Sequence, residues 1–313
     1  MQLIVLKGEV KTLKKTLHLF LILLVIFACN FSAQAAGLSL ETGKIDGDTT
    51  YVISGPQSGG FKSELIFPIQ QQVMELGYQL PLGKYKIESL NFSLLKNIED
   101  ESGTFIDSDW LYSYSSEKAI YSESDNYLDF YTVDLAVDFF PLYNSDSGNS
   151  YFNLSAGYQK QDFDFDVYNL EQINYLTDRE SIVPGKVLTY QIEYSFPYLA
   201  LNWQKKSKQA QAWNYRISLG FSPFLKAEDR DDHILRDKLS YIEADGEALL
   251  AELDLSYNFS SNFAFFAAWD YLSLAADGTQ TQKNYSGTVL FENIDAEISS
   301  KQSLFSAGMS YKF

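Results

Sequence analysis

The sequence has very little cysteine and histidine. It contains one cysteine, Cys29, and two histidines, His18 and His233, in 313 residues. Cys29 and His18 lie in an N-terminal segment that we expect to be removed, so the mature chain would hold no thiol and one imidazole. This excludes disulfide bonds and thiol chemistry. It also disfavours a zinc enzyme, because catalytic zinc usually binds three protein ligands and commonly more than one histidine.

Positive charge is also scarce. The chain has 24 Lys and Arg against 41 Asp and Glu, a net charge of −17. Residues 1–35 hold four of the lysines and one glutamate, so the remainder has 20 basic against 40 acidic residues, a net charge of −20. Nucleic acid binding is excluded, because it depends on Lys and Arg neutralising phosphates. A chain this acidic attracts cationic peptides instead.

The N-terminal apolar segment, residues 17–27, is too short for a transmembrane helix, which needs about 20 residues. It follows a lysine-rich stretch and precedes Ala33-Gln34-Ala35, small residues suited to cleavage. This pattern predicts a signal peptide over residues 1–35 and export across a bacterial inner membrane. Cys29 leaves open a lipoprotein-type site, although the Ala-x-Ala site is the better fit.

The sequence is rich in aromatic residues and in alternating patterns. It has 22 Tyr and 23 Phe, and aromatic residues make up 16% of the chain. In the last nine residues, apolar side chains occupy the odd positions from Phe305 to Phe313, with small or polar residues between them. The same period of two, typical of strands, recurs at 133–139, 213–221 and 252–259. A terminal Phe with an aromatic residue two places earlier resembles the closing strand of bacterial outer-membrane barrels.

Alternation is also typical of a soluble β-sandwich. The signal peptide, the aromatic strand ends and the charge on the non-apolar face favour a membrane barrel, whose polar face lines the lumen. The prediction is an all-β fold: one ten-stranded antiparallel transmembrane β-barrel over residues 36–313, with short periplasmic turns and long extracellular loops. We expect strands near 37–47, 61–80, 85–95, 127–140, 150–168, 185–204, 213–224, 246–260, 263–274 and 301–313.

Two of the long connections carry clusters of acids. The stretch FIDSDW, residues 105–110, lies in the connection at 96–126, and DRDDH, residues 229–233, lies in the connection at 225–245. Each connection follows an odd-numbered strand, so both emerge on the same side of the membrane. Because a ten-stranded barrel is narrow, the two clusters are able to meet across its mouth.

These motifs resemble those of a known family. Asp107-Ser108-Asp109-Trp110 and Asp231-Asp232-His233 are similar to the two catalytic motifs of the omptins, outer-membrane aspartyl-type endopeptidases of Gram-negative bacteria. Gly157-Tyr158-Gln159, the segment FPYLALN at 196–202 and the closing SAGMSYKF at 306–313 are similar as well. The resemblance implies an endopeptidase of the outer membrane whose active site faces the cell exterior.

The resemblance also implies a role for each catalytic residue. Asp231 would orient His233 and stabilise its charged form. His233 would activate a water molecule as general base, while Asp107 and Asp109 face the pair and share protons. No covalent nucleophile is required, in agreement with the absence of a G-x-S-x-G signature.

Substrate binding is implied in the same way. Asp229 matches the acid at the base of the pocket for the residue preceding the cut, and Asp48, with a one-residue gap, would be the second pocket acid. Such carboxylates select Lys or Arg, so we expect cationic peptides or proteins as substrates, with no cofactor and no metal. Lys160 is the one basic residue in the stretch where omptins hold lipopolysaccharide, and Glu193 replaces an expected arginine. This puts lipopolysaccharide dependence in doubt.

Other classes remain open on the sequence alone. A non-catalytic surface barrel, serving as an adhesin or structural protein, would bind basic partners with the same acidic loops. Calcium binding is disfavoured, because DRDDH lacks the spaced ligands and the turn glycine of an EF-hand loop. A diffusion pore is disfavoured too, because ten strands leave little lumen. We expect a monomer.

Overall fold

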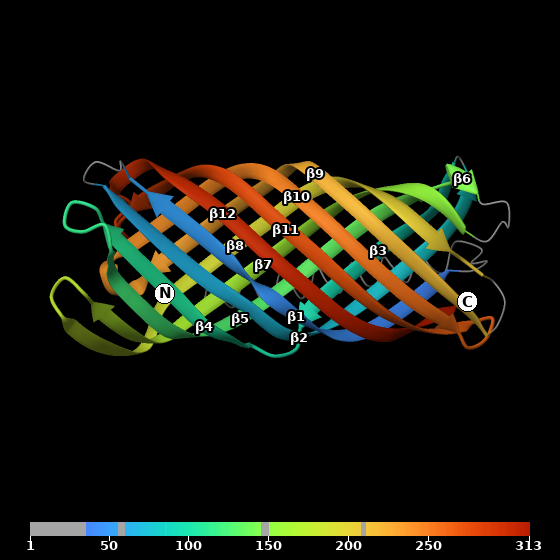
Figure 1. Ribbon diagram of the computed structural model, residues 1–313, viewed down its shortest axis with the longest axis horizontal. Coiled ribbons are helices and arrows are strands. Elements are labelled where there is room, and N and C mark those ends of the chain that lie inside the picture. Colours follow the sequence, from blue (N-terminus) through green and yellow to red (C-terminus); the bar gives the residue numbers. More distant parts are fainter. Residues whose placement is uncertain (1–35, 56–59, 85, 145–149, 208–210) are drawn as a thin grey trace.

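The computed structural model describes residues 36–55, 60–84, 86–144, 150–207 and 211–313. The predicted signal peptide, with Cys29 and His18, lies outside the described residues. The described chain is almost entirely β-structure wound into one barrel (Figure 1). The elements are β1 (Gly37–Ser54), β2 (Phe61–Lys84), β3 (Ile87–Asn97), β4 (Glu101–Leu111), β5 (Lys118–Phe139), β6 (Tyr143–Asn144), β7 (Ser150–Asn174), β8 (Arg179–Lys205), β9 (Ala212–His233), the short 3-10 helix η1 (Ile234–Arg236), β10 (Lys238–Asn258), β11 (Phe263–Lys283) and β12 (Val289–Lys312).

The barrel closes by pairing its last strand with its first. β12 runs antiparallel to β1 from the pair Gly37 and Lys312 to the pair Ser54 and Asp295. β3 and β4 each pair with both β2 and β5, so they are two segments of one barrel strand. β6 is a two-residue addition to β7. Ten antiparallel strands therefore form the ring, which confirms the predicted fold class.

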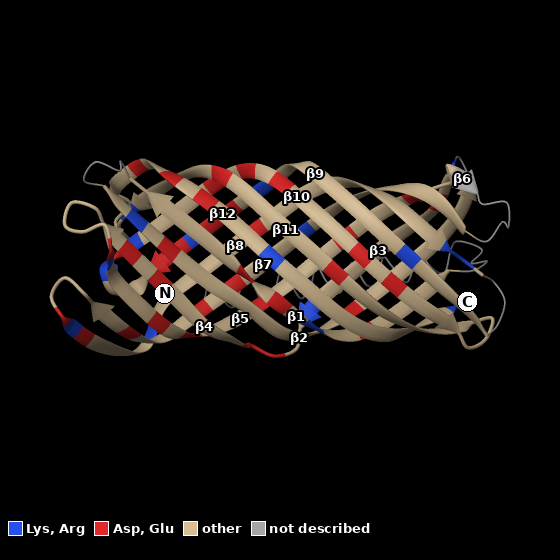
Figure 2. Cartoon of the chain, viewed as in Figure 1, with Lys and Arg blue, Asp and Glu red and all other residues tan. Residues whose placement is uncertain are grey.

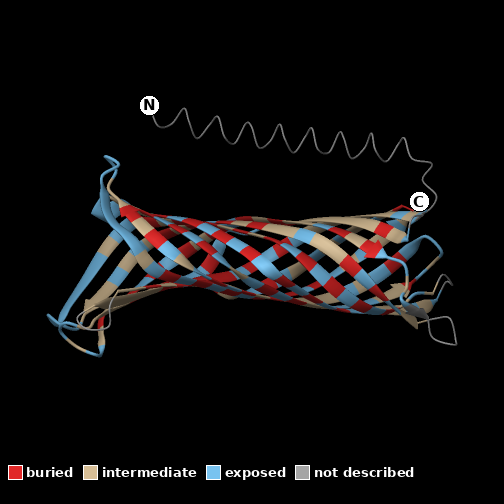
Figure 3. Ribbon diagram, turned by 90° about the horizontal axis from the view of Figure 1, so that it is seen from above, coloured by how far each residue is buried: buried red, intermediate tan, exposed pale blue. Residues whose placement is uncertain are grey.

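The outer wall carries an apolar band near the end that holds the C-terminus. Buried and exposed residues alternate along the strands (Figure 3), as in a wall with one face to a lumen and one to lipid. The band consists of large exposed apolar side chains, among them Leu38, Leu40, Met74, Leu135, Leu154, Leu199, Leu201, Trp203, Trp213, Leu219, Phe221, Leu249, Leu253, Leu255, Phe263, Phe265, Phe305 and Met309. No helix within the described residues is long and apolar enough to cross a bilayer.

We call the end of the barrel with Phe313 the proximal end and the opposite end the distal end. The strands continue past the apolar band at the distal end. On β9, Phe224 is the last large exposed apolar side chain, nine residues before His233. Acidic residues are densest toward this end (Figure 2).

The two long connections that were predicted at 96–126 and 225–245 are mostly strand. The first contains β4 and the start of β5, and the second contains the end of β9 and the start of β10. The residues outside the strands are therefore 98–100, 112–117 and 234–237. The physical reason is that apolar alternation stops where the outer wall leaves lipid, while backbone pairing goes on. Hydropathy therefore marks the lipid-facing part of each strand and misses its aqueous extension.

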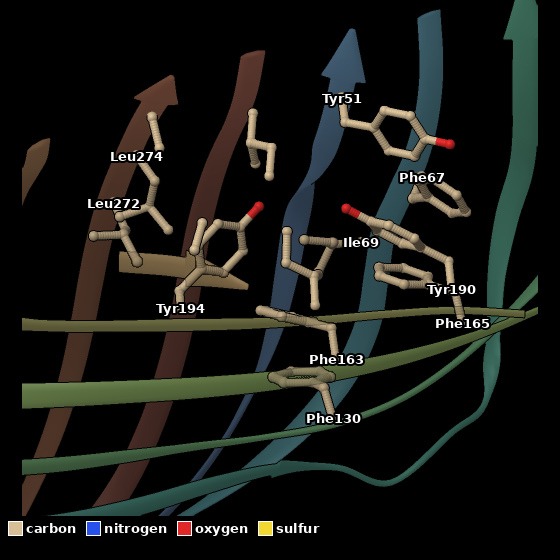
Figure 4. Close-up of a cluster of buried hydrophobic side chains, with 14 of the residues drawn as sticks. Tyr51, Phe67, Ile69, Phe130, Phe163, Phe165, Tyr190, Tyr194, Leu272 and Leu274 are labelled. Atoms are coloured by element: carbon tan, nitrogen blue, oxygen red, sulfur yellow. The ribbon is translucent and has the colours of Figure 1, made fainter. Parts of the chain in front are cut away.

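The lumen has two zones. A layer of buried aromatic side chains lies in its distal half. Within this layer (Figure 4), Phe67 is stacked on Tyr190 at a centroid distance of 4.3 Å and lies 5.0 Å from Phe165. On the proximal side of this layer is a cavity of about 280 Å³ lined by carboxylates and by Arg216. The aromatic layer thus separates the distal mouth from the proximal cavity.

Candidate active site

Asp231 and His233 form a hydrogen-bonded pair at the distal end of β9. The strand alternates so that Asp229 and Asp231 point inward and are buried. His233 Nε2 lies 2.8 Å from Asp231 Oδ2, with 13% of the histidine side chain exposed and none of the aspartate side chain. β9 ends at His233, and η1 begins at the next residue. The pair therefore sits where the inner wall meets the mouth.

The carboxyl of Asp231 is held in its charged form. Burial alone would raise its pKa, but His233, the Tyr51 hydroxyl and Lys238 together lower it below the usual value. A buried ionised carboxylate keeps the imidazole oriented and stabilises a proton that the imidazole gains. Oδ1 of the same carboxylate is buried and accepts no hydrogen bond from the described residues.

Asp107 lies on β4, which is not a neighbour of β9 in the ring. Burial, followed by the charge of Asp109, raises the pKa of Asp107 to about 7, and the charge of Asp231 adds to this, while Arg236 and Lys238 act against it. The structure therefore brings the two acid motifs into one electrostatic environment across the mouth. Asp107 Oδ1 is buried without a hydrogen-bond partner among the described residues.

Asp229 lies deeper in the lumen than Asp231 and is 7% exposed. Its Oδ1 accepts the backbone N–H of Ile242 at 2.7 Å. The Tyr190 hydroxyl is close to the carboxyl, but Oδ2 makes no hydrogen bond of normal geometry within the part of the chain that the structure describes. Burial, and then the charge of Asp231, hold the pKa of Asp229 well above its usual value. Such a carboxyl either keeps a proton or takes a cationic partner.

Asp48 is not brought to this site. On β1 the inward side chains are those of Thr49 and Tyr51, which are fully buried. Asp48 lies on the other face of the strand, where it accepts a hydrogen bond from Thr50 Oγ1 at 3.3 Å. Because successive residues of a strand point to opposite faces, the carboxylate of Asp48 lies on the outer wall, away from Asp229.

Tyr51 and Lys238 also contact the hydrogen-bonded pair of β9, and no sequence motif marks them. The Tyr51 hydroxyl donates to Asp231 Oδ2 at 2.5 Å, and Lys238 is the cross-strand partner of His233. The alternation of β1 identifies Tyr51 as inward-facing, but no sequence signal pairs it with a residue 180 positions away. Across the described ranges, no group of three or more His, Cys, Asp or Glu is arranged to hold a metal ion.

The arrangement can perform acid–base chemistry. The imidazole has a charged carboxylate behind it and an exposed part toward the mouth, which suits a general base. Asp107 is near half-protonation at neutral pH, so it is able to act as the acid. Two titratable groups whose environments move their pKa values in opposite directions, such as Asp231 and Asp107, are typical of a catalytic site.

Comparison with known proteins places the chain in one family. The model of the Omptin family matches residues 33–313. The "Plasminogen activator" of Yersinia pestis is 24% identical over 294 residues, which cover 91% of each chain. The crystal structure of the outer membrane protease OmpT from Escherichia coli superposes with a TM-score of 0.77 at 16% identity, covering 91% of this chain and 98% of that one. The structural likeness shows the same fold.

Proposed function

Since the chain belongs to the Omptin family, we propose that it is an outer-membrane endopeptidase that hydrolyses its substrates with a water molecule activated by His233. The observation that carries this proposal is the hydrogen-bonded Asp231–His233 pair, together with the effect of the Asp231 charge on Asp107 of β4, a strand that does not neighbour β9 in the ring. An adhesin has no need of such a pair.

The proposed reaction divides the proton transfers between the two motifs. Nε2 of His233 is bonded to Asp231, which leaves Nδ1 to take a proton from the attacking water. The negative charge of Asp231 stabilises the imidazolium that forms. Asp107, whose pKa is raised to about 7 by burial and by the charge of Asp109, would donate its proton to the carbonyl oxygen as the tetrahedral intermediate forms. As the intermediate breaks down, the imidazolium of His233 would give its proton to the leaving amine, and Asp107 would take its proton back from the hydroxyl group of the intermediate.

The proposed substrates are cationic. Asp229 lies below the Asp231–His233 pair as a buried carboxyl with a free oxygen atom. A Lys or Arg side chain entering from the mouth would give this carboxyl the partner that it lacks, and the substrate charge would favour its ionised form. The acidic residues at the distal end would attract such substrates from solution. In this proposal the distal end faces the cell exterior.

The test is cleavage of a fluorogenic peptide with one internal Arg-Arg bond. Refolded wild type is measured beside His233→Ala and Asp107→Ala, and both variants should lose at least about a hundredfold in kcat/KM, the usual range for a general base or acid. A matched peptide with citrulline in place of arginine keeps the shape and removes the charge, so it should be cut much more slowly. If correctly folded wild type cuts no peptide of a diverse library, the chain is a non-catalytic surface barrel.

A further inference from the structure

Tyr51 connects the first strand of the barrel to the catalytic pair. Its hydroxyl donates to Asp231 Oδ2 at 2.5 Å, and the same oxygen atom lies 2.8 Å from His233 Nε2. β1 pairs only with β2 and β12, so its contact with β9 crosses the lumen instead of following the sheet. One carboxylate oxygen therefore receives two donors, from two separate sides of the barrel.

The ring of Tyr51 is fixed in place. It is 1% exposed and packs against Tyr190 at a centroid distance of 5.3 Å and against Phe67 at 6.4 Å (Figure 4). A buried tyrosine usually places its hydroxyl on a hydrogen-bond partner, and here the aromatic layer fixes the direction of that bond. Burial, and then the charge of Asp231, raise the pKa of Tyr51 well above the usual value. The hydroxyl therefore remains a donor over the whole working pH range.

We propose that Tyr51 is a positioning residue for the proposed reaction: it fixes the Asp231 carboxylate and limits how strongly that carboxylate holds a proton on His233. The inference rests on the proposed function. A hydrogen bond to the charged oxygen draws off part of its negative charge, so the imidazole binds a proton less tightly and releases it more readily. It also stops the carboxylate from rotating, which keeps Nδ1 of the imidazole aimed at the mouth.

Several elements place charged or titratable groups around Asp231 and His233. They are Asp107 and Asp109 of β4, Tyr190 of β8, Asp229 and Asp232 of β9, Arg236 of η1 and Lys238 of β10. Tyr51→Phe leaves all of them unchanged and removes one oxygen atom. A change in proton binding at His233 in that variant is therefore attributable to the lost hydroxyl.

The aromatic layer offers a matched control. Tyr194 is also fully buried, and its hydroxyl is bonded to Thr49 Oγ1 at 3.2 Å and to neither residue of the pair. Tyr194→Phe therefore removes a buried hydroxyl from the same layer without touching Asp231. Any general loss of packing or stability should appear in both variants.

The first experiment measures kcat, KM and their pH dependence for full-length wild type, Tyr51→Phe and Tyr194→Phe on the Arg-Arg peptide. For Tyr51→Phe we expect kcat to fall about tenfold, the size of a lost hydrogen bond to a charged group, with KM changed less than about twofold. The acid limb of the kcat/KM profile should move to higher pH. Tyr194→Phe should match wild type in all three. Equal kcat losses in both variants, with no movement of the acid limb, would overturn the inference.

The second experiment needs no activity. Histidine labelled with ¹⁵N gives two sets of imidazole signals in the full chain, because the chain contains only His18 and His233. His233→Ala identifies the set that belongs to His233. In Tyr51→Phe the His233 imidazole should keep its proton to higher pH than in wild type, and in Tyr194→Phe it should not. Identical titrations in all three proteins would refute the role of Tyr51 even in an active enzyme. If the His233 titration shifts in Tyr51→Phe but the wild-type protein is inactive, the effect of Tyr51 on the pair is retained and the proposed function alone is rejected.

Discussion

Two buried aspartates of the inner wall, Asp138 and Asp231, lie in opposite halves of the lumen. Asp138, in the proximal half, accepts hydrogen bonds from Ser89, Asn91 and Ser155, and Arg216 lies 3.9 Å away, so both carboxylate oxygens are engaged. Asp231, in the distal half, accepts both of its donors on Oδ2, and its Oδ1 has no hydrogen-bond partner among the described residues. Burial alone does not separate a structural acid from a reactive one.

The difference lies in what surrounds each carboxylate. The donors around Asp138 include neutral hydroxyl and amide groups that cannot take up a proton near neutral pH. One donor to Asp231 is an imidazole, a group that is able both to take up and to release a proton. A saturated carboxylate stabilises the barrel, whereas an acid with a spare oxygen and a titratable partner is able to take part in proton transfer.

The largest expected effect comes from replacing each of these acids by its amide. Asp231→Asn should lower kcat/KM for the Arg-Arg peptide by about 10²–10⁴-fold, because an amide neither holds the imidazole in one orientation nor stabilises its charge. Asp138→Asn should change the rate less than about twofold in the protein that folds. Peptide cleavage by the refolded variants measures both. A large loss of kcat/KM in Asp138→Asn alone would show that the reactive acid lies in the proximal half of the lumen and the structural acid in the distal half.

The next effect is on the alkaline limb of the pH–rate profile. Below its pKa of about 7, Asp107 is mostly protonated and able to donate, so kcat/KM should fall as the pH rises through this value. In Asp107→Asn the rate should be low throughout and this limb should be missing. Profiles measured from pH 5 to 9 will show this. An alkaline limb retained in Asp107→Asn would assign it to another group.

A smaller effect concerns stability. The pKa of Asp229 is raised in the folded state, so the folded chain binds this proton more tightly, and stability falls as the pH rises from about 4 toward the folded pKa. Asp229→Asn removes that loss and should raise the unfolding temperature by about 2–4 °C at pH 8, with no gain at pH 4. Asp138→Asn should lower the unfolding temperature, because an amide NH₂ group cannot accept hydrogen bonds from the surrounding donors. Thermal unfolding in detergent tests both signs.

The smallest expected effect is that of lipopolysaccharide. On the outer wall, Lys160 is paired with Glu193 at 2.6 Å, and acids such as Asp162 lie nearby on the same face. Phosphates would have to displace this pairing against negative charge. Adding lipopolysaccharide should therefore change kcat/KM less than about twofold. A rate that rises tenfold or more with lipopolysaccharide would contradict this prediction.

Much of the fold was predictable because lipid imposes a period of two on the outer wall. Segments that alternate in this way, such as 213–221, identify the strands. The number of strands and their antiparallel order follow from these segments. The distal extensions of β4 and β9 were not predicted as strands, because regular apolar alternation does not run through them and backbone pairing defines them. The error in placing Asp107 and His233 on loops has the same origin.

The site was predictable only in part. The resemblance identified Asp231 and His233, but their shared face follows from the alternation of β9, which was predicted to end before them. Asp48 was proposed from a resemblance with a gap, and the alternation of β1 turns it outward. The contact of Tyr51 with Asp231 depends on barrel diameter and strand tilt, which local sequence does not specify.

The aromatic layer beneath the site leaves the distal mouth as the route by which a substrate reaches His233. A polypeptide that reaches His233 must enter the distal mouth, because Phe67 and its neighbours fill the lumen below. Both fragments must leave through the same mouth. Release of the fragments therefore competes with entry of the next chain. In the proposed function, the same layer keeps the peptide substrate on the distal side of the lumen.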